Sequence, residues 1–397
     1  MSSDGVVRVL HMIASLDIGG SQSMVMNIYR NIDRSKVQFD FIVDHPEQMY
    51  FAEEIKKLGG KIFVLHTFRL INIGEVRKAW ASFFRKHPEY KILHSHSRSY
   101  ASLYLPIAKK YGVKTIIHSH STSNGKGAKA IIKNIMQYPL RFQADYYMAC
   151  SEEAGEWLFG KRVLKKNNFY IIKNAIDAKR FIYCLNKRRA VRCEFGLDDN
   201  TFVLGALGRV ILPKNPAFII EVFRKLKEWK VDSKLLFVGD GDLLDDMKHK
   251  TMDYGLSGDV IFTGARDDAD RMLCAMDCYI FPSLWEGLGI SLIEAQASGL
   301  RCLCSENIPR EAIFTDLVKV LPLGKGSEVW AGYIADTAGQ KCAGNTDCIE
   351  DGLDMDEALG MRYRRENQYA TVVKAGYDIG ENIAFMQKFY LSLNEQK

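Results

Sequence analysis

Short apolar runs rich in β-branched residues alternate along this chain with longer stretches whose apolar residues recur every three or four positions. The short runs predict strands, and the longer stretches predict amphipathic helices. In the first half of the chain we expect seven strands, at Val6–Ile13, Phe39–Val43, Lys61–Leu65, Lys91–His94, Lys114–His118, Tyr146–Ala149 and Phe169–Ile172. Strands that alternate with helices in this way indicate a parallel sheet covered by helices.

The alternation stops over residues 178–201, which are polar and basic with turn signals, and we interpret them as a linker. It resumes with five expected strands, at Thr201–Leu207, Lys234–Val238, Val260–Thr263, Cys278–Phe281 and Arg301–Cys304. The pattern therefore predicts two α/β domains, residues 1–180 and 181–375. Ligands of such sheets bind at the carboxyl ends of the strands, so two domains facing each other would form a small-molecule cleft.

Residues 376–397 form a separate element. Apolar side chains recur along one side of Ile379–Leu393, which predicts an amphipathic helix. Because this pattern is too strong for a solvated tail, we expect the helix to dock on one of the domains.

Composition narrows the class of protein. The 397 residues have the apolar and charged fractions of a globular protein, and no run of 18 apolar residues predicts a membrane span. The first residues lack the basic region and cleavage site of a secretory signal, so we expect a cytoplasmic protein. The nine cysteines contain no recurring CxxC pair, so we expect no metal site.

Basic residues are concentrated in the first domain. Residues 85–141 contain 11 Lys and Arg residues but one acidic residue, Glu89. Two interpretations stay open, a solvated surface or a face for an anionic partner such as a membrane leaflet, a phospholipid or a polyphosphate. We do not expect nucleic acid as a partner, because no recognition motif or regular aromatic interleaving accompanies the charge.

The segment FPSLWEGLGISLIEAQASGL, residues 281–300, combines a strand end, a tight turn and a helix. Gly289 permits close backbone approach, and the free N–H groups of Gly289, Ile290 and Ser291 at the helix start suit a phosphate. Glu286 lies in the turn and Glu294 in the helix.

Eight residues along a helix span about 12 Å, which is too far for the carboxylate pair of a retaining glycosidase, about 5–5.5 Å apart. We therefore expect Glu286 and Glu294 to hold opposite ends of one extended ligand with a phosphate in its middle. A nucleotide sugar has that shape. The alternative is that one acid complements the helix dipole and the other is solvated.

Two further loops follow strands of the second domain. In GRVILPKN, Arg209 and Lys214 suit a diphosphate leaving group, or are ordinary surface charges. In VGDGDL, Gly239 allows backbone to approach a ligand. We expect Asp240 and Asp242 to cap the following helix rather than to hold a metal.

In the first domain, Gly19 and Gly20 precede a helix and form either an anion site or a tight turn. Two histidines, His118 and His120, end a later strand, and we expect either that one faces inward and the other outward or that one caps the strand end. A histidine near a strand end is more often structural than catalytic, and the same applies to His94 and His96.

In this order, the double glycine, the HSH strand end, KNAIDAKRF, GRVILPKN, VGDGDL and E-x7-E resemble the retaining glycosyltransferases of family 4. The resemblance covers nearly the whole chain. It implies the GT-B fold, in which two Rossmann-like parallel-sheet domains face each other across a cleft and the C-terminal helix crosses back to the first domain. It also implies a nucleotide-sugar co-substrate, for which we expect UDP as the nucleotide, and neither a cofactor nor a metal.

The resemblance assigns the donor contacts. Glu286 would contact hydroxyls of the donor sugar and Glu294 would contact the ribose. Arg209, Lys214 and the amides of residues 289–291 would hold the diphosphate.

The resemblance also assigns residues of the first domain. Gly19 and Gly20 would approach the phosphates, and His120, followed by Ser121 and Thr122, matches the active-site histidine near the transferred sugar. One departure is that Ser21 and Gln22 stand where the family often has Ala and Glu. A second departure is Arg301, which replaces a proline.

The resemblance implies transfer with retention. Because no second carboxylate is well placed, we expect the acceptor hydroxyl to attack on the face that the diphosphate leaves, with that diphosphate serving as base. We expect a lipid-linked or cell-surface glycan acceptor at the cytoplasmic face of the membrane. Two rival functions stay open. One is a non-catalytic module that binds sugar nucleotides or glycans, and the other is a GT-B epimerase that releases UDP-sugar isomers without an acceptor.

Overall fold

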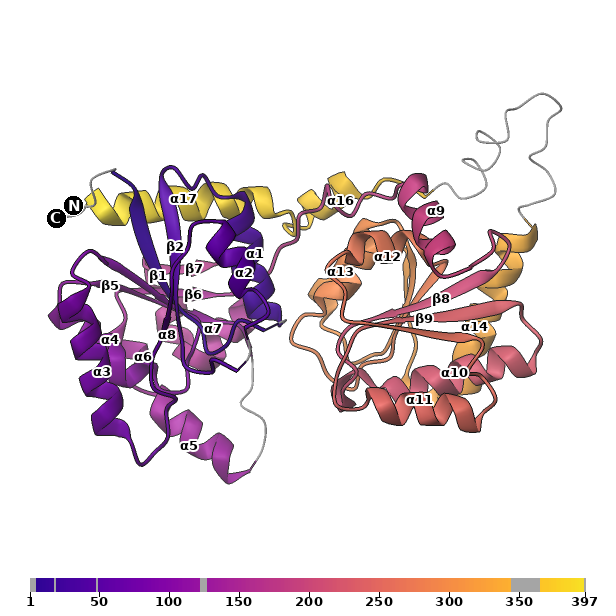
Figure 1. Cartoon of the computed structure of the whole chain (residues 1–397), viewed down its shortest axis with the longest axis horizontal. Coiled ribbons are helices and arrows are strands. Elements are labelled where there is room, and N and C mark those ends of the chain that lie inside the picture. The colour runs from indigo at the N-terminus through magenta and orange to yellow at the C-terminus, as the bar shows by residue number, and fades with distance from the viewer. Residues whose placement is uncertain (1–4, 18, 48, 122–126, 344–364, 396–397) are drawn as a thin grey trace. The chain divides into compact units, whose positions relative to one another are not determined.

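The computed structural model describes residues 5–17, 19–47, 49–121, 127–343 and 365–395 (Figure 1). The chain divides into two compact units, of which unit 1 comprises Met1–Ile176 with Asp378–Lys397, and unit 2 comprises Asp177–Tyr377. Each unit is a parallel sheet with helices packed against it. None of the helices in the described ranges combines the length and apolar composition needed to cross a bilayer.

Unit 1 contains a seven-stranded sheet in the order β3-β2-β1-β4-β5-β6-β7, and every neighbouring pair is parallel. Its strands are β1 (Val7–Met12), β2 (Val37–Val43), β3 (Ile62–Val64), β4 (Ile92–Ser95), β5 (Lys114–Ser119), β6 (Tyr146–Ala149) and β7 (Phe169–Ile171). All seven expected strands are present, with ends that differ by at most two residues. The strand order reverses between β1 and β4, which places a switch point at their carboxyl ends.

The helices of unit 1 connect these strands on both sides of the sheet. They are α1 (Gly20–Asn31), α2 (Ala52–Lys57), α3 (Ile73–Lys86), α4 (Ala101–Lys110), α5 (Ala128–Gln137), α6 (Leu140–Gln143), α7 (Glu152–Phe159) and α8 (Lys161–Leu164). Two separate apolar clusters, one on each face of the sheet, form its core. Because both faces are covered, β2 is buried along its whole length.

The final helix, α17 (Ile379–Glu395), packs on unit 1 (Figure 1). Met386, Phe389, Tyr390 and Leu393 are buried in the apolar cluster that also contains residues of β1 and β2. The side-chain amide of Asn382 donates to the Lys173 carbonyl at 2.8 Å. The C-terminal helix therefore completes the first unit, as the family resemblance implies.

Unit 2 contains a six-stranded parallel sheet in the order β10-β9-β8-β11-β12-β13. Its strands are β8 (Phe202–Leu207), β9 (Ser233–Val238), β10 (Val260–Gly264), β11 (Cys278–Phe281), β12 (Arg301–Cys304) and β13 (Val318–Val320). The five expected strands form, and β13 is an additional edge strand. Its three residues are largely exposed, so they carry no apolar run that the sequence pattern could detect.

Within the described residues, the helices of unit 2 are α9 (Leu185–Glu194), α10 (Pro216–Glu228), α11 (Leu244–Asp253), α12 (Ala269–Ala275), α13 (Ile290–Ala297), α14 (Gly326–Ala343) and α16 (Tyr369–Lys374). Three short 3₁₀ turns, η1 (Leu212–Lys214), η2 (Arg310–Ala312) and η3 (Leu323–Lys325), lie in the connections. The order again reverses at the centre, between β8 and β11, which marks a second switch point.

The interpretation of residues 178–201 as a linker is wrong. They belong to unit 2, and their middle part is helix α9, which packs on α12. Arg188 and Arg192 of this helix are 1% and 2% exposed. Their guanidinium groups bind the carboxylate of Asp277, which neutralises charges that the sequence pattern assigned to solvent.

Candidate functional site

Three loops of unit 2 meet at the carboxyl edge of its sheet. They follow β8, β9 and β11, which are neighbours because β8 pairs with both other strands. The loop after β8 carries Arg209 and Lys214, the loop after β9 carries Gly239, and the loop after β11 carries Glu286. Sheet order thus assembles residues that are far apart in the sequence at the switch point.

Glu286 and Lys214 form an ion pair at this edge. The ammonium of Lys214 donates to Oε1 of Glu286, which also accepts a hydrogen bond from the Ser283 hydroxyl at 2.7 Å. The side chain of Glu286 is 9% exposed and that of Lys214 is 24% exposed. The Lys214 ammonium also lies 5.1 Å from the ring centre of Phe281. A buried carboxylate and a cation therefore lie side by side next to an aromatic ring.

Helix α13 begins beside this pair without a side-chain cap. Gly289 has φ of 85°, and a Cβ there would approach the Phe281 ring to 3.1 Å, so the turn requires glycine. The Tyr279 hydroxyl lies 2.9 Å from the Ser291 hydroxyl oxygen and 3.0 Å from the Leu207 carbonyl, which ties the helix start to β8. The amides of residues 289–291 therefore lie at an uncapped helix N-terminus that favours an anion.

Glu294 lies one turn further along α13. Burial raises the pKa of its carboxyl to about 8, with Arg180 opposing and Asp270 adding to the shift. A raised pKa favours the protonated form of this carboxyl near neutral pH. A protonated carboxyl can both donate and accept, which suits contact with hydroxyl groups.

The other loop residues take simpler positions. Arg209 is exposed next to the buried Val210. Gly239 has φ of 147°, and a Cβ there would lie 1.9 Å from the Gly208 carbonyl oxygen, so the glycine allows the loops after β8 and β9 to touch.

The expectation that Asp240 and Asp242 cap the next helix is wrong. Helix α11 has Leu243 at its N-cap position, with no side-chain hydrogen bond. Asp240 instead accepts from the amide of Gly241 at 2.7 Å, and both acids are exposed.

In unit 1, Gly19 is the N-cap of α1 and Gly20 is its first residue, and no side chain caps the helix. A Cβ at Gly19 would lie 2.6 Å from the Gln22 side-chain oxygen, so the glutamine folds back over the loop. The Gln22 amide lies 3.3 Å from both the carbonyl and the hydroxyl oxygen of Ser15. Gln22 therefore braces this loop at the position where the family often has Glu.

His120 lies just after β5, and His118 is the next-to-last residue of that strand. Their rings stack with centroids 4.1 Å apart. The expectation that one faces inward and the other outward is wrong, because residues two apart on a strand share a face. Thr122, which follows in the resemblance, lies outside the described residues.

Three more histidines join these two, and the sequence reasoning missed this grouping. His11 of β1 pairs in register with His94 of β4, and His96 follows two positions later. Loss of hydration lowers the pKa of His11 and His120 to about 3, and the pKa values of the other three lie well below the usual value. The signal was the HxH pattern repeated at adjacent strand ends, which puts four imidazoles on one face.

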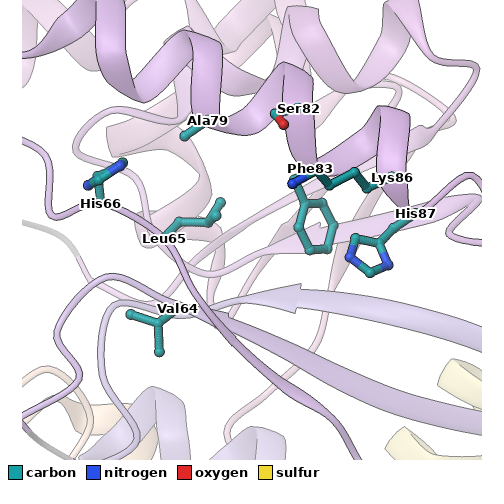
Figure 2. Close-up of a pocket in the computed structure, with 8 residues that line it drawn as sticks. All are labelled: Val64, Leu65, His66, Ala79, Ser82, Phe83, Lys86 and His87. Atoms are coloured by element: carbon teal, nitrogen blue, oxygen red, sulfur yellow. The ribbon is translucent and has the colours of Figure 1, made fainter.

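A hollow elsewhere on unit 1 lies between the end of β3 and helix α3 (Figure 2). It is lined by Val64, Leu65, His66, Ala79, Ser82, Phe83, Lys86 and His87. None of the expected site residues lines it, so the loop ends described above remain the candidate site.

Comparison with known proteins yields two family matches and several relatives. The family described as glycosyl transferases group 1 matches residues 187–326, and Glycosyltransferase Family 4 matches residues 18–180. EpsF of Bacillus subtilis (strain 168), which is named for glycosyltransferase activity, is 30% identical over 397 residues, 96% of each chain. The UDP-Gal:alpha-D-GlcNAc-diphosphoundecaprenol alpha-1,3-galactosyltransferase of Escherichia coli is 25% identical, covering 77% of this chain and 80% of its own.

A solved structure shows the same fold at lower identity. Anabaena Alr3699/HepE in complex with UDP-glucose superposes with a TM-score of 0.72 at 16% identity, covering 97% of this chain and 99% of its own. The two parallel-sheet units therefore have the GT-B architecture.

Proposed function

This chain belongs to the family 4 glycosyltransferases, and from that premise we propose that it transfers a sugar, with retention, from a UDP-sugar to a lipid-linked or glycan acceptor in polysaccharide biosynthesis. The observation that carries the proposal is the Lys214–Glu286 pair beside the uncapped start of α13. UDP-Gal appears in the name of the Escherichia coli relative, and the Anabaena structure is a complex with UDP-glucose.

Unit 2 binds the donor in this proposal. Glu286 accepts hydrogen bonds from hydroxyls of the sugar, and Glu294 contacts the ribose. Lys214, Arg209 and the α13 amides hold the diphosphate. Lys214 has three N–H groups, so it can bind Glu286 and a phosphate oxygen together.

The chemical step breaks the bond between the anomeric carbon and the diphosphate and forms a bond from that carbon to the acceptor oxygen on the same face. The acceptor proton passes to the departing phosphate oxygen. Lys214, Arg209 and the helix N-terminus stabilise the charge that develops on the diphosphate, so the step needs no Mg²⁺ on the phosphates. His120 of unit 1 contributes a neutral imidazole beside the transferred sugar.

We expect UDP to stabilise the protein selectively in a thermal unfolding assay with EDTA present. A ligand at 100 times its dissociation constant adds about 2.7 kcal/mol to the free energy of unfolding, whereas ADP and GDP should add far less. Lys214→Met should abolish most of the shift because it removes a phosphate contact. Equal shifts with all nucleotides, or none with any, would count against a UDP-sugar site.

The products of the reaction distinguish sugar transfer from the two rival functions. A transferase releases UDP from the UDP-sugar at a rate that depends on the acceptor, an epimerase yields UDP-sugar isomers without one, and a binding module yields neither. Since all three bind the nucleotide, this product assay follows the unfolding assay.

The acceptor side of the proposal rests on an exposed apolar face in unit 1. Along α5 and α6, large apolar side chains lie in solvent, and they are Ile131 (61% exposed), Ile132 (40%), Ile135 (68%), Tyr138 (57%) and Phe142 (72%). Lys133 and Arg141 lie among them. An amphipathic helix that combines exposed apolar and basic residues fits the interface of an anionic bilayer, where a lipid-linked acceptor would be found.

We expect the double variant Ile131→Ser with Ile135→Ser to bind phosphatidylglycerol-containing vesicles at least about 10-fold more weakly, because each isoleucine loses apolar burial. Vesicle flotation measures the bound fraction. The matched control is Met252→Ser, since Met252 is 63% exposed on α11 of unit 2 and should not matter. Flotation that is equal for the double variant, or equal on pure phosphatidylcholine, would reject this membrane face.

A further inference from the structure

Five histidines from three adjacent strands form one buried cluster in unit 1. They lie at or just beyond β1, β4 and β5 and are His11, His94, His96, His118 and His120. The first four are at most 8% exposed, and His120 retains partial exposure. The proposed transfer uses one imidazole, that of His120, beside the sugar. The other four imidazoles have no role in the proposed transfer step.

Two chains of contacts run through the cluster. In one, His11 Nδ1 lies 3.0 Å from His96 Nε2, and His96 Nδ1 lies 2.8 Å from His120 Nε2. In the other, the Tyr390 hydroxyl of α17 lies 2.7 Å from His94 Nδ1, and His94 Nε2 lies 3.3 Å from His118 Nδ1.

The Nε2 atom of His118 lies at the outer end of these chains, is buried and has no hydrogen-bond partner among the described residues. An unsatisfied buried nitrogen destabilises the fold, so a group that binds it would stabilise the protein. At His120, the neighbouring side chain of Asn174 is a partner.

We propose that His96, His118 and His120 form a binding site for one transition-metal ion of the Zn²⁺ class. One ring nitrogen from each of the three lies within 4.8 Å of the other two. In a tetrahedral zinc site such nitrogens are about 3.3 Å apart, as follows from bonds of about 2.0–2.1 Å. Small shifts of the side chains therefore close the site, and neutral imidazoles are the form that binds metal.

The contacts decide between this trio and a second one, His11, His94 and His96, which is also close enough. Both nitrogens of His94 are already held, one by Tyr390 and one by His118. The inner trio would break one of these contacts. The outer trio keeps both contacts of His94, because His118 binds through Nε2 and donates its Nδ1–H to His94. An ion there replaces only the contact between His96 Nδ1 and His120 Nε2.

The same logic supplies an outer shell for each ligand. His11 contacts Nε2 of His96, His94 contacts Nδ1 of His118, and the side chain of Asn174 interacts with that of His120. Such partners fix ring orientation and raise metal affinity. Arg98, a cation that also interacts with His120, favours an anionic fourth ligand such as hydroxide.

The histidine site would bind a different class of metal ion from the one that accompanies phosphate groups. Three imidazoles suit Zn²⁺, Co²⁺, Ni²⁺ or Cu²⁺, whereas Mg²⁺ requires oxygen ligands. The expectation of no metal site rested on cysteine spacing, on Asp240 with Asp242 and on the family resemblance, and none of these considered the histidine cluster. A bound ion would hold His120 and so compete with its proposed place beside the sugar.

The test is a Co²⁺ titration of the full chain, made without a histidine tag and stripped with a chelator. We expect one Co²⁺ per chain with visible bands of low coordination number, and displacement by Zn²⁺, which binds such sites more tightly. Removing a ligand, with His118→Asn or with the less buried His120→Ala, should weaken Co²⁺ by about 100-fold or more, since outer-shell losses alone cost 10–100-fold.

Two further variants sharpen the result. Tyr390→Phe keeps the ring in the core and should weaken Co²⁺ about 10-fold, because His94 loses its support. If the inner trio bound the ion, this variant would free a nitrogen and bind as tightly or more tightly, which would overturn the assignment. His45→Asn, at an exposed histidine of the same unit, should bind like the parent. The absence of saturable binding at one ion per chain would overturn the site altogether.

Discussion

Glu286→Gln should lower kcat/KM for sugar transfer by about 10²–10³-fold, the loss typical when one preorganised polar contact to a transition state is removed. The carboxylate is almost fully buried and is fixed by Ser283 and Lys214. An amide of the same shape keeps the packing, but it loses the negative charge that accepts hydrogen bonds from the sugar and that orients Lys214. The initial rate of UDP release with acceptor present measures the effect.

The ion pair between Glu286 and Lys214 also predicts how the two substitutions combine. Because each side chain positions the other, Lys214→Met should cause a loss of similar size, and the double variant should lose much less than the product of the two. Glu228→Gln, at an exposed acid on α10, is the matched control and should keep full activity. If Glu286→Gln or Lys214→Met stayed within a few-fold of the parent, the proposed donor site would be wrong.

The fold was predictable from sequence where burial produces a local pattern. The twelve expected strands each contain a run of apolar residues, and most of them are buried in sheets covered on both faces. The thirteenth, β13, is an exposed three-residue edge strand whose position is set by pairing with β12. Its neighbours, rather than its own residues, hold it in the sheet.

The candidate site was predictable only in part, because its geometry depends on which strands are adjacent. The loop motifs identified Lys214 and Glu286 separately, but they are 72 positions apart, and only the pairing of β8 with β11 brings them into contact. The same holds for the histidines. Considered one at a time, His94 and His118 were interpreted as structural residues. The pairing of β4 with β5 brings their side chains into one cluster.

The largest error of the sequence interpretation concerns residues 178–201, and its cause is electrostatic. A basic stretch reads as solvated because an isolated buried charge is costly. Arg188 and Arg192 are buried nevertheless, since one carboxylate, that of Asp277, accepts from both at 2.9 and 2.7 Å. Carbonyl groups at the end of α12 also face these arginines, with Arg192 Nε 3.1 Å from the Ala275 oxygen.

Asp277→Asn should therefore destabilise unit 2 by about 3–5 kcal/mol, the cost of breaking a buried ion pair by removing one partner. The amide keeps the shape of the side chain, but it leaves two buried guanidinium groups without their counter-charge and presents N–H groups to them. It also weakens the acceptor for the Val203 amide, now 2.8 Å away, which fixes the start of β8. Urea unfolding, followed by the fluorescence of Trp229, Trp285 and Trp330 in a chain whose unit 1 tryptophans are replaced by Phe, measures the change.

The matched control is Asp259→Asn. Asp259 also binds two cations, Lys227 and Lys234, but its side chain is 27% exposed, and such surface pairs contribute about 1 kcal/mol or less. If both variants lost the same small amount, the Asp277 cluster would not hold α9 on the sheet. A loss confined to Asp277→Asn would show that burial, rather than the number of ion pairs, decides the stability of this unit. It would also explain why the most basic part of the presumed linker is part of a core.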